Sequence, residues 1–157
     1  MGSVAMSEGI ILIASITVAA GISVVVLNQM GILQSTIIQS NAKEKDITLT
    51  RIKILYVSNT SSNVFSVWAK NIGSTDIASL DRIDIYFGKV GSARHIPYNS
   101  VSPPSWVISD ASVKSWRIMD TLQIDVTNDI PLEINTTYFI RLVTPNGISD
   151  DYVFSIS

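Results

Sequence analysis

The feature that most constrains this chain is a long segment without a charged side chain. No Asp, Glu, Lys or Arg lies between Glu8 and Lys43, so residues 9–42 are uncharged. Residues 9–27 are apolar apart from Ser and Thr, and as a helix they would be about 28 Å long. That length suits the roughly 30 Å hydrocarbon core of a bilayer, where unpaired backbone groups are costly and a helix is favoured. We therefore expect a transmembrane helix over residues 9–27, after a tail over 1–8.

Two other interpretations of this segment fit the sequence less well. A cleaved secretory signal has a basic region before an apolar run of about 7–15 residues. Residues 1–7 contain no basic side chain, and the apolar run here is longer. A buried core helix of a soluble protein is disfavoured because the run has no polar face.

Small residues on one side of the expected helix indicate a helix-packing face. Ser15, Ala19 and Ser23 recur at every fourth position. This spacing permits close approach of a second helix in lipid. The simpler explanation is that Ala and Ser are common residues.

Beyond the apolar run, residues 28–46 are expected to continue as a helical stalk or linker. Met30, Leu33 and Ile37 recur at helical spacing and form an apolar seam between polar, uncharged residues. A solvated helix usually carries charges. Their absence over residues 28–41 suggests that the seam packs against another chain.

The sequence gives conflicting indications of topology. Lys43 and Lys45 follow the apolar segment, and by the positive-inside rule they favour a cytoplasmic C-terminal part. Two N-glycosylation sequons, at Asn59 and Asn135, favour the outside of the cell. Two sequons can also arise by chance in a chain rich in Asn, Ser and Thr. The residues alone leave the orientation open.

After residue 46 the hydrophobic pattern alternates, as in half-buried strands. In residues 81–87, for example, Ile83, Ile85 and Phe87 share one face. We expect residues 47–157 to form an all-β, immunoglobulin-like sandwich behind the single transmembrane helix. Its pattern changes phase near Arg51, which suggests a bulge or a strand that crosses between sheets. The expected strands, about seven in number, cover residues 47–57, 64–70, 81–87, 113–119, 121–126, 137–143 and 151–156.

Composition argues against several kinds of chemistry. The chain has no cysteine for a disulfide or thiolate site, and one histidine, His95, which we expect at the surface or in a loop. Its net charge of −2 gives no basic surplus for nucleic acid. Residues 88–92 contain glycines and a lysine without Walker spacing, and Asp150 and Asp151 are expected in a solvated turn. We expect no enzyme activity, cofactor or metal.

The remaining possibility is that the domain recognises another molecule through its strand edges and surface side chains. Edge strands carry unpaired N–H and C=O groups, and few charges protect them here. If residues 113–119 form a strand, Trp116 and Ile118 lie on one face and both faces carry apolar groups. We expect a contact between protomers at Trp116 and Ile118. Core burial is nevertheless the default expectation for each tryptophan: Trp68, Trp106 and Trp116.

Several runs resemble one known family. Residues 6–21, MSEGIILIASITVAAG, resemble the N-terminal anchor of the FlaG proteins of the archaellum. The runs VWAKNIG, LDRIDIYFG and TPNGI look like parts of the sandwich domains shared by FlaG and FlaF. The resemblance to the FlaG/FlaF stator family covers nearly the whole chain, and the anchor favours FlaG.

This resemblance implies a non-enzymatic stator component of the archaellum motor. It implies a single-pass protein of the archaeal cytoplasmic membrane, with its β-domain in the pseudo-periplasmic space. It also implies self-association, a FlaF-like partner and an indirect link to the S-layer. Two alternatives stay open: a pilin-like or archaellin-like filament subunit, whose signal would need a basic residue that residues 1–8 lack, and a membrane-tethered adhesion module that recognises sugar.

Overall fold

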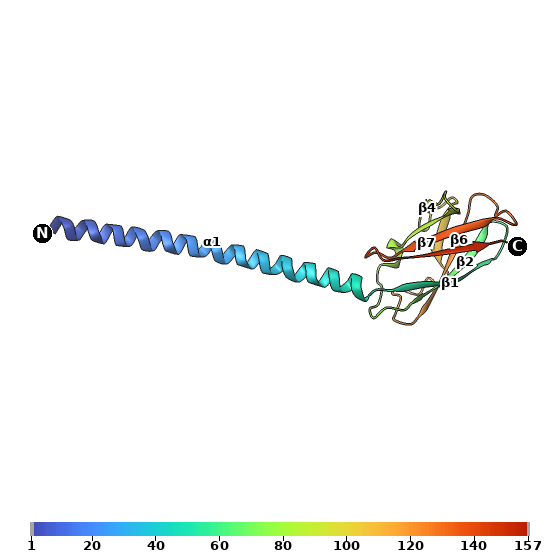
Figure 1. The fold of residues 1–157 in the computed structure, drawn as a ribbon, viewed down its shortest axis with the longest axis horizontal. Helices are drawn as coiled ribbons and strands as arrows, with labels where there is room; N and C mark the ends of the chain where they lie inside the picture. Colours follow the sequence, from blue (N-terminus) through green and yellow to red (C-terminus); the bar gives the residue numbers. More distant parts are fainter. Residues whose placement is uncertain (1, 157) are drawn as a thin grey trace. The chain divides into compact units, whose positions relative to one another are not determined.

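The computed structural model describes residues 2–156, and within them the side chains of 6–42 and 44–156. The chain divides into two compact units between Lys43 and Glu44. The long N-terminal helix as far as Lys43 makes up one unit. The helix's last turn and all the strands make up the other (Figure 1).

Helix α1 (Gly2–Leu49) includes the whole uncharged segment. Every described side chain over residues 6–42 is exposed, which leaves a helix apolar on all sides without protein cover. The hydroxyls of Ser15, Thr17 and Ser23 each donate to the carbonyl four residues earlier, at 2.8 Å. The three side-chain hydroxyls within residues 9–27 are therefore paired within the helix, as a lipid environment requires. By length and composition, Met6–Leu49 qualifies as a candidate membrane span.

Within the described residues, the strands form two antiparallel four-stranded sheets. Their orders are β1-β2-β6-β5 and β4-β3-β7-β8. Lettered along the chain, these are A-B-E-D and C′-C-F-G, the strand arrangement of immunoglobulin domains. The predicted immunoglobulin-like sandwich is confirmed. The strands are β1 (Ile52–Asn59), β2 (Val64–Asn71), β3 (Asp84–Lys89), β4 (Arg94–Ile96), β5 (Ser105–Ile108), β6 (Thr121–Thr127), β7 (Thr137–Val143) and β8 (Ser149–Ser155).

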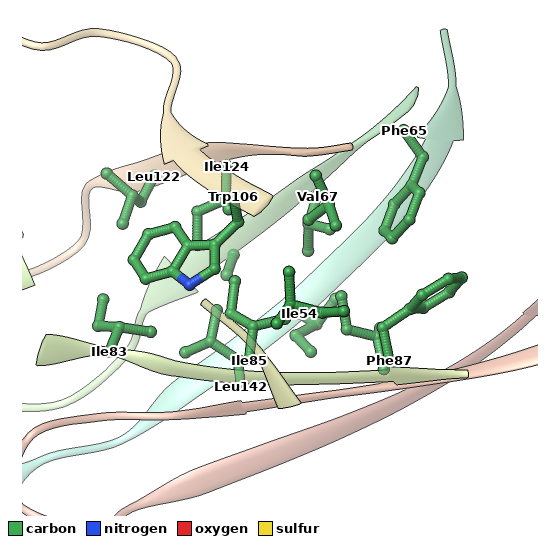
Figure 2. Packing of buried hydrophobic residues seen from close by; sticks show 14 of the residues in the cluster. Ile54, Phe65, Val67, Ile83, Ile85, Phe87, Trp106, Leu122, Ile124 and Leu142 are labelled. Carbon is green, nitrogen blue, oxygen red and sulfur yellow. The ribbon is translucent and has the colours of Figure 1, made fainter. Parts of the chain in front are cut away.

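The core lies between the two sheets and is built from alternate strand residues. Val67 and Ile124 point inward from the first sheet, and Ile85 and Leu142 from the second, all fully buried (Figure 2). The rings of Phe65 and Phe87 lie 4.5 Å apart between their centroids and join the two layers. Each such side chain contributes about 1.5–3 kcal/mol through burial. Because the chain has no cysteine and so no disulfide, the burial of these side chains between the layers stabilises the sandwich.

The first strand begins later than the sequence predicted. Instead of a strand from residue 47, α1 continues to Leu49 and β1 starts at Ile52. The Ser74 N–H donates to the Leu49 carbonyl at 2.8 Å, so the helix end gains a partner that its local sequence does not reveal. A bulge is present, but at Leu55, where the β1–β2 register shifts, and not near Arg51.

Other strand predictions differ from the structure in short or irregular segments. The predicted strands at 64–70, 121–126, 137–143 and 151–156 correspond to β2, β6, β7 and β8. The run 81–87 begins in a 3-10 turn, η1 (Leu80–Arg82), and β4 and β5 were missed. The predicted strand at 113–119 is absent. Trp116 makes one isolated bridge with Ile77, and a turn follows it.

Candidate functional site

Chemically reactive groups are dispersed over the sandwich. Among the described residues, no group of three or more His, Asp or Glu side chains could hold a metal ion. His95 lies on β4, half exposed, with Nε2 3.2 Å from the Asp84 carboxylate. The sequence instead predicts contacts through surface side chains of the sandwich.

The structure separates the two residues predicted to form an assembly contact. Trp116 is 1% exposed and its indole N–H donates to the Asp120 carbonyl at 2.9 Å. A side chain so deeply buried does not reach the surface, so the predicted contact at Trp116 is wrong. The chain turns after Trp116, and the side chains therefore do not alternate as on a strand. Ile118 is 45% exposed, and its N–H donates to the Asp76 carboxylate at 2.9 Å.

Ile118 belongs to a group of exposed apolar side chains on two neighbouring turns. Met119 and Ile72 are also exposed, and the Met119 N–H donates to the Asn71 carbonyl at 2.9 Å. This bond places the turn of residues 118–119 beside that of 72–74. We call Ile72, Ile118 and Met119 the turn patch. Sequence reasoning found only Ile118, because the other two come together through a tertiary contact.

The remaining tryptophans take different positions. Trp106 is buried as expected, whereas Trp68 lies on the outer face of the first sheet and is not a core residue. Val67 and Ala69 face inward, so the strand alternation turns Trp68 outward. There it stacks on Tyr56, with ring centroids 4.4 Å apart and planes 7° from parallel.

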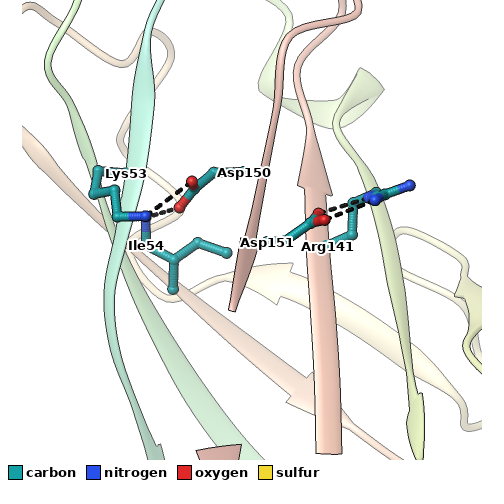
Figure 3. A network of polar contacts seen from close by, with 5 residues as sticks. All are labelled: Lys53, Ile54, Arg141, Asp150 and Asp151. Atoms are coloured by element: carbon teal, nitrogen blue, oxygen red, sulfur yellow. Dashed lines mark hydrogen bonds and ion pairs between the residues drawn. The ribbon is translucent and has the colours of Figure 1, made fainter. Parts of the chain in front are cut away.

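At one side of the sandwich, a carboxylate joins the edge strands of the two sheets. Asp150 on β8 accepts from the Lys53 ammonium at 3.0 Å and from the Ile54 N–H at 2.7 Å (Figure 3). Its side chain is 17% exposed, so the predicted solvated turn at Asp150 and Asp151 is wrong. Asp151 is instead bound by Arg141 through two bonds of 2.6 Å, and the Arg141 hydrogen bond lowers the pKa of this carboxyl. The Asp150 clamp links the edge strands β1 and β8 of opposite sheets.

The opposite side of the sandwich is also partly closed. The segment after β4 pairs in parallel with β5, through bonds from the Trp106 N–H to the Pro97 carbonyl (3.0 Å) and from the Asn99 N–H to the Trp106 carbonyl (2.8 Å). Both sides are therefore less open to strand addition than the sequence suggested. This favours assembly through side-chain patches over edge pairing.

The end of α1 is held by loops from both sheets. Thr50 is buried and its hydroxyl donates to the Asp46 carbonyl at 2.6 Å. The Asn146 side chain, from the β7–β8 turn, donates to the Thr50 hydroxyl at 2.7 Å and to the Asp46 carbonyl at 3.3 Å. At Gly73, after β2, a Cβ would lie 2.5 Å from the Leu49 carbonyl oxygen. We call this cluster the helix junction. It was not predicted, because residues 46 and 146 are 100 positions apart.

The remaining predicted residues fall on the surface of their units. Ser15, Ala19 and Ser23 are exposed on α1. Asn59, the last residue of β1, and Asn135, in the turn before β7, are both exposed. No described residue covers any of these positions.

Comparison with known proteins places this architecture in a family. A family model described as archaeal-type flagellin matches residues 2–154. The chain belongs to the archaeal-type flagellin family. A comparison with curated proteins gives no match. The archaeal-type flagellin family and its FlaG relatives are structural components of the archaellum and not known as enzymes, which confirms the non-enzymatic interpretation.

Solved structures bear out the resemblance to FlaG. The archaellum periplasmic stator protein FlaG from Sulfolobus acidocaldarius is 36% identical, over 68% of this chain and 100% of that chain, with a TM-score of 0.63. The FlaF and FlaG stator complex from the same organism matches at 36% identity over 68% and 90%, with a TM-score of 0.62. The archaeal flagellum of Methanospirillum hungatei strain JF1 matches at 13% identity over 97% and 93%, with a TM-score of 0.75, and shows a shared fold. A structural role in archaeal motility follows for this chain.

Proposed function

We propose that this archaeal-type flagellin relative is a static component of the archaellum motor. The observation that carries the proposal is the 36% identity with FlaG, a periplasmic stator protein. In this role α1 anchors the chain in the lipid of the cytoplasmic membrane, and the sandwich lies in the pseudo-periplasmic space. The sandwich self-associates, joins a FlaF-like partner and connects through it to the S-layer. The FlaF and FlaG stator complex supports the choice of partner.

The build of the chain supports a static, anchored part. A stator must be held in the membrane and must pass load to a fixed structure. Residues 9–27 supply an apolar span whose hydroxyls are already paired. The helix junction ties the end of α1 to loops of both sheets. None of these tasks needs an active site.

Self-association has a candidate surface in the turn patch. Large apolar side chains gathered at the surface of a soluble domain are typical of protein contacts. Because the Asp150 clamp and the β4–β5 segment occupy parts of both open sides, the turn patch around Ile118 is the contact we favour. Burial of one isoleucine at such a contact contributes roughly 1.5–3 kcal/mol.

The test is Ile118→Lys in the 44–157 fragment, which forms a compact unit with its own core. The variant should stay folded, because Ile118 is not in the core. It should raise the concentration needed for assembly by about tenfold or more, measured by light scattering and electron microscopy. Ile130→Lys, at another exposed isoleucine that lies outside the turn patch, is the matched control. Filaments unchanged by Ile118→Lys would reject this surface.

A second candidate is an archaellin-like filament subunit, with α1 packed in a filament core. The family match over residues 2–154 and the fold shared with the Methanospirillum hungatei flagellum over 97% of this chain favour it. Mass spectrometry of the native N-terminus separates the two. Cleavage just before the apolar run would support the filament subunit and contradict the stator. An uncut N-terminus supports the stator.

A further inference from the structure

Both sequons of this chain lie in one cluster of loops. Asn59 ends β1, and Asn135 lies in the turn before β7 with a φ of 58°. Two backbone bonds of 2.7 Å, from the Leu132 N–H to the Ser62 carbonyl and from the Asn128 N–H to the Asn63 carbonyl, join the β1–β2 turn to the β6–β7 loop. We call residues 59–63 and 128–136 the loop end. The length of β1 separates it from the helix junction.

The asparagines of the loop end fall into two classes. Asn63 and Asn128 use their side chains to hold the loops, through donors to the Asn128 carbonyl (3.4 Å) and the Ile130 carbonyl (2.7 Å). Asn59 and Asn135 are exposed, and their side chains make no hydrogen bond to another described residue. The asparagines with free amides are the two that begin sequons. The asparagines that hold the loops are thus different from those that begin sequons.

The loop end also exposes large apolar side chains. Ile134, next to Asn135, is 70% exposed, and Ile130 is 60% exposed. Exposed isoleucines in a domain that assembles are a hazard, because they invite contacts at the wrong place. A bulky, hydrated group attached at Asn135 would shield them.

We propose that Asn59 and Asn135 carry N-linked glycans that cover the loop end and leave the turn patch open for protein contacts. The donor is an oligosaccharide linked through phosphate to a lipid. The side-chain Nδ2 forms a bond to C1 of the first sugar, the bond from C1 to the phosphate oxygen breaks, and the lipid phosphate leaves as the amide loses one proton. The inference rests on the proposed placement of the sandwich outside the cytoplasmic membrane.

The sequence offers matched variants for a test. Ser61 and Thr137 occupy the third positions of the two sequons, and Ser62 and Thr136 are their neighbours with the same hydroxyls. Ser61→Ala and Thr137→Val remove the sequons and leave both asparagines in place, so Asn135 keeps its left-handed backbone. Ser62→Ala and Thr136→Val are the controls.

The full chain is expressed in an archaeal host that N-glycosylates its surface proteins, and its intact mass is measured after extraction from membranes. The wild type and both controls should exceed the mass of the polypeptide by two glycans. Each sequon variant should lose one glycan, and the double variant should return to the polypeptide mass. A wild type at the polypeptide mass, or sequon variants with unchanged mass, would overturn the inference.

A cysteine label separates failure of this inference from failure of the proposed location. The chain has no cysteine, and Val153 is an exposed residue of β8 outside the loop end. Val153→Cys is labelled in intact cells with a maleimide that does not cross membranes. Labelling without a glycan would reject the glycans and keep the outside location. Absence of labelling, with labelling restored after lysis, would reject the location and the glycans together.

Discussion

Single carboxylates hold parts of the sandwich that the core does not reach. Asp150 satisfies the Ile54 N–H beside the β1 bulge and joins the two sheets. Asp125, on the outer face of the first sheet, accepts from the Ser66 and Ser109 hydroxyls at 2.7 Å each and from the Gln123 amide at 3.2 Å. Asp125 thereby ties β2, β6 and the end of β5 together.

Asp125 should make the free energy of unfolding depend on pH in the acidic range. Burial raises the pKa of its carboxyl, but the hydrogen bonds from Ser66, Ser109 and Gln123 outweigh burial, and the net pKa lies below its usual value. Its contribution is therefore present above the ordinary aspartate pKa of about 3.9 and is lost as pH falls through the lower folded value. We expect the free energy of unfolding, measured with urea, to fall less between pH 7 and pH 3 for Asp125→Asn than for the wild type.

The control for this experiment is Asp81→Asn, at an exposed aspartate that makes no hydrogen bond to another described residue. Its pH dependence should follow that of the wild type. Equal acid sensitivity in the wild type and Asp125→Asn would show that the three hydrogen bonds do not set the folded pKa.

Residue-level prediction succeeded where alternation is regular and failed where a turn interrupts it. Ile83, Ile85 and Phe87 are buried together, as the pattern indicated. Trp116 and Ile118 have the same spacing, yet one is in the core and the other exposed. The turn at residues 118–119 breaks the two-residue period, and its Asp76 contact lies 42 positions away.

At the scale of elements, the helix junction makes the last turn of α1 part of the sandwich unit. Carbonyls at a helix end have no partner within the helix. Here Ser74 donates to Leu49, and Asn146 donates to Asp46 and to Thr50. The two sheets thus jointly cap one helix.

Removing one donor should loosen this turn. Asn146→Asp keeps the oxygen that accepts from the Thr144 hydroxyl but loses the donor to Thr50. We expect faster hydrogen exchange at the Thr50 amide, whose N–H donates to the Asp46 carbonyl, and a loss of about 1–3 kcal/mol of unfolding free energy. Asn99→Asp, at an exposed asparagine away from the helix junction, should leave this amide unchanged. Equal exchange in the two variants would exclude the proposed cap.

Elements were predictable in proportion to their length. The long strands β2, β6 and β7 carry several alternations and were found, whereas β4 has 3 residues and β5 has 4, too few to establish a period. The start of β1 was misplaced because Ile47 and Leu49 suit either a helix or a strand. Tertiary hydrogen bonds at the helix junction decide between them.

At the scale of the whole molecule, the small number of charged side chains gives the two parts of the chain different properties. One is a helix whose uncharged surface is exposed over residues 9–42. The other is a sandwich whose apolar turns and sparse charges leave room for protein contacts. The long apolar helix was predictable from the run of residues without charge. Of the exposed turn patch, only Ile118 was singled out from the sequence, because a patch on a sandwich depends on which turns meet.

Helix association in the membrane should depend on the small-residue face. The Ser15 and Ser23 hydroxyls donate within their own helix, so this face would associate through close contact and not through hydrogen bonds between helices. We expect Ala19→Leu to reduce cross-linking of full-length chains in membranes several-fold. Thr17→Leu lies on the opposite side of the helix and is the control. Equal cross-linking in both variants would dismiss this face.

The Asp150 clamp has a mechanical consequence. β1 is the first strand after the helix, and it is bound to β2 along its length and to β8 through Asp150. A pull on residue 50 along the strand acts at right angles to the interstrand hydrogen bonds, because antiparallel bonds run across the strands. The bonds then share the load and must break together, while the carboxylate resists sliding between the layers. Where the last turn of α1 leads into β1, the fold is therefore arranged to bear tension in shear.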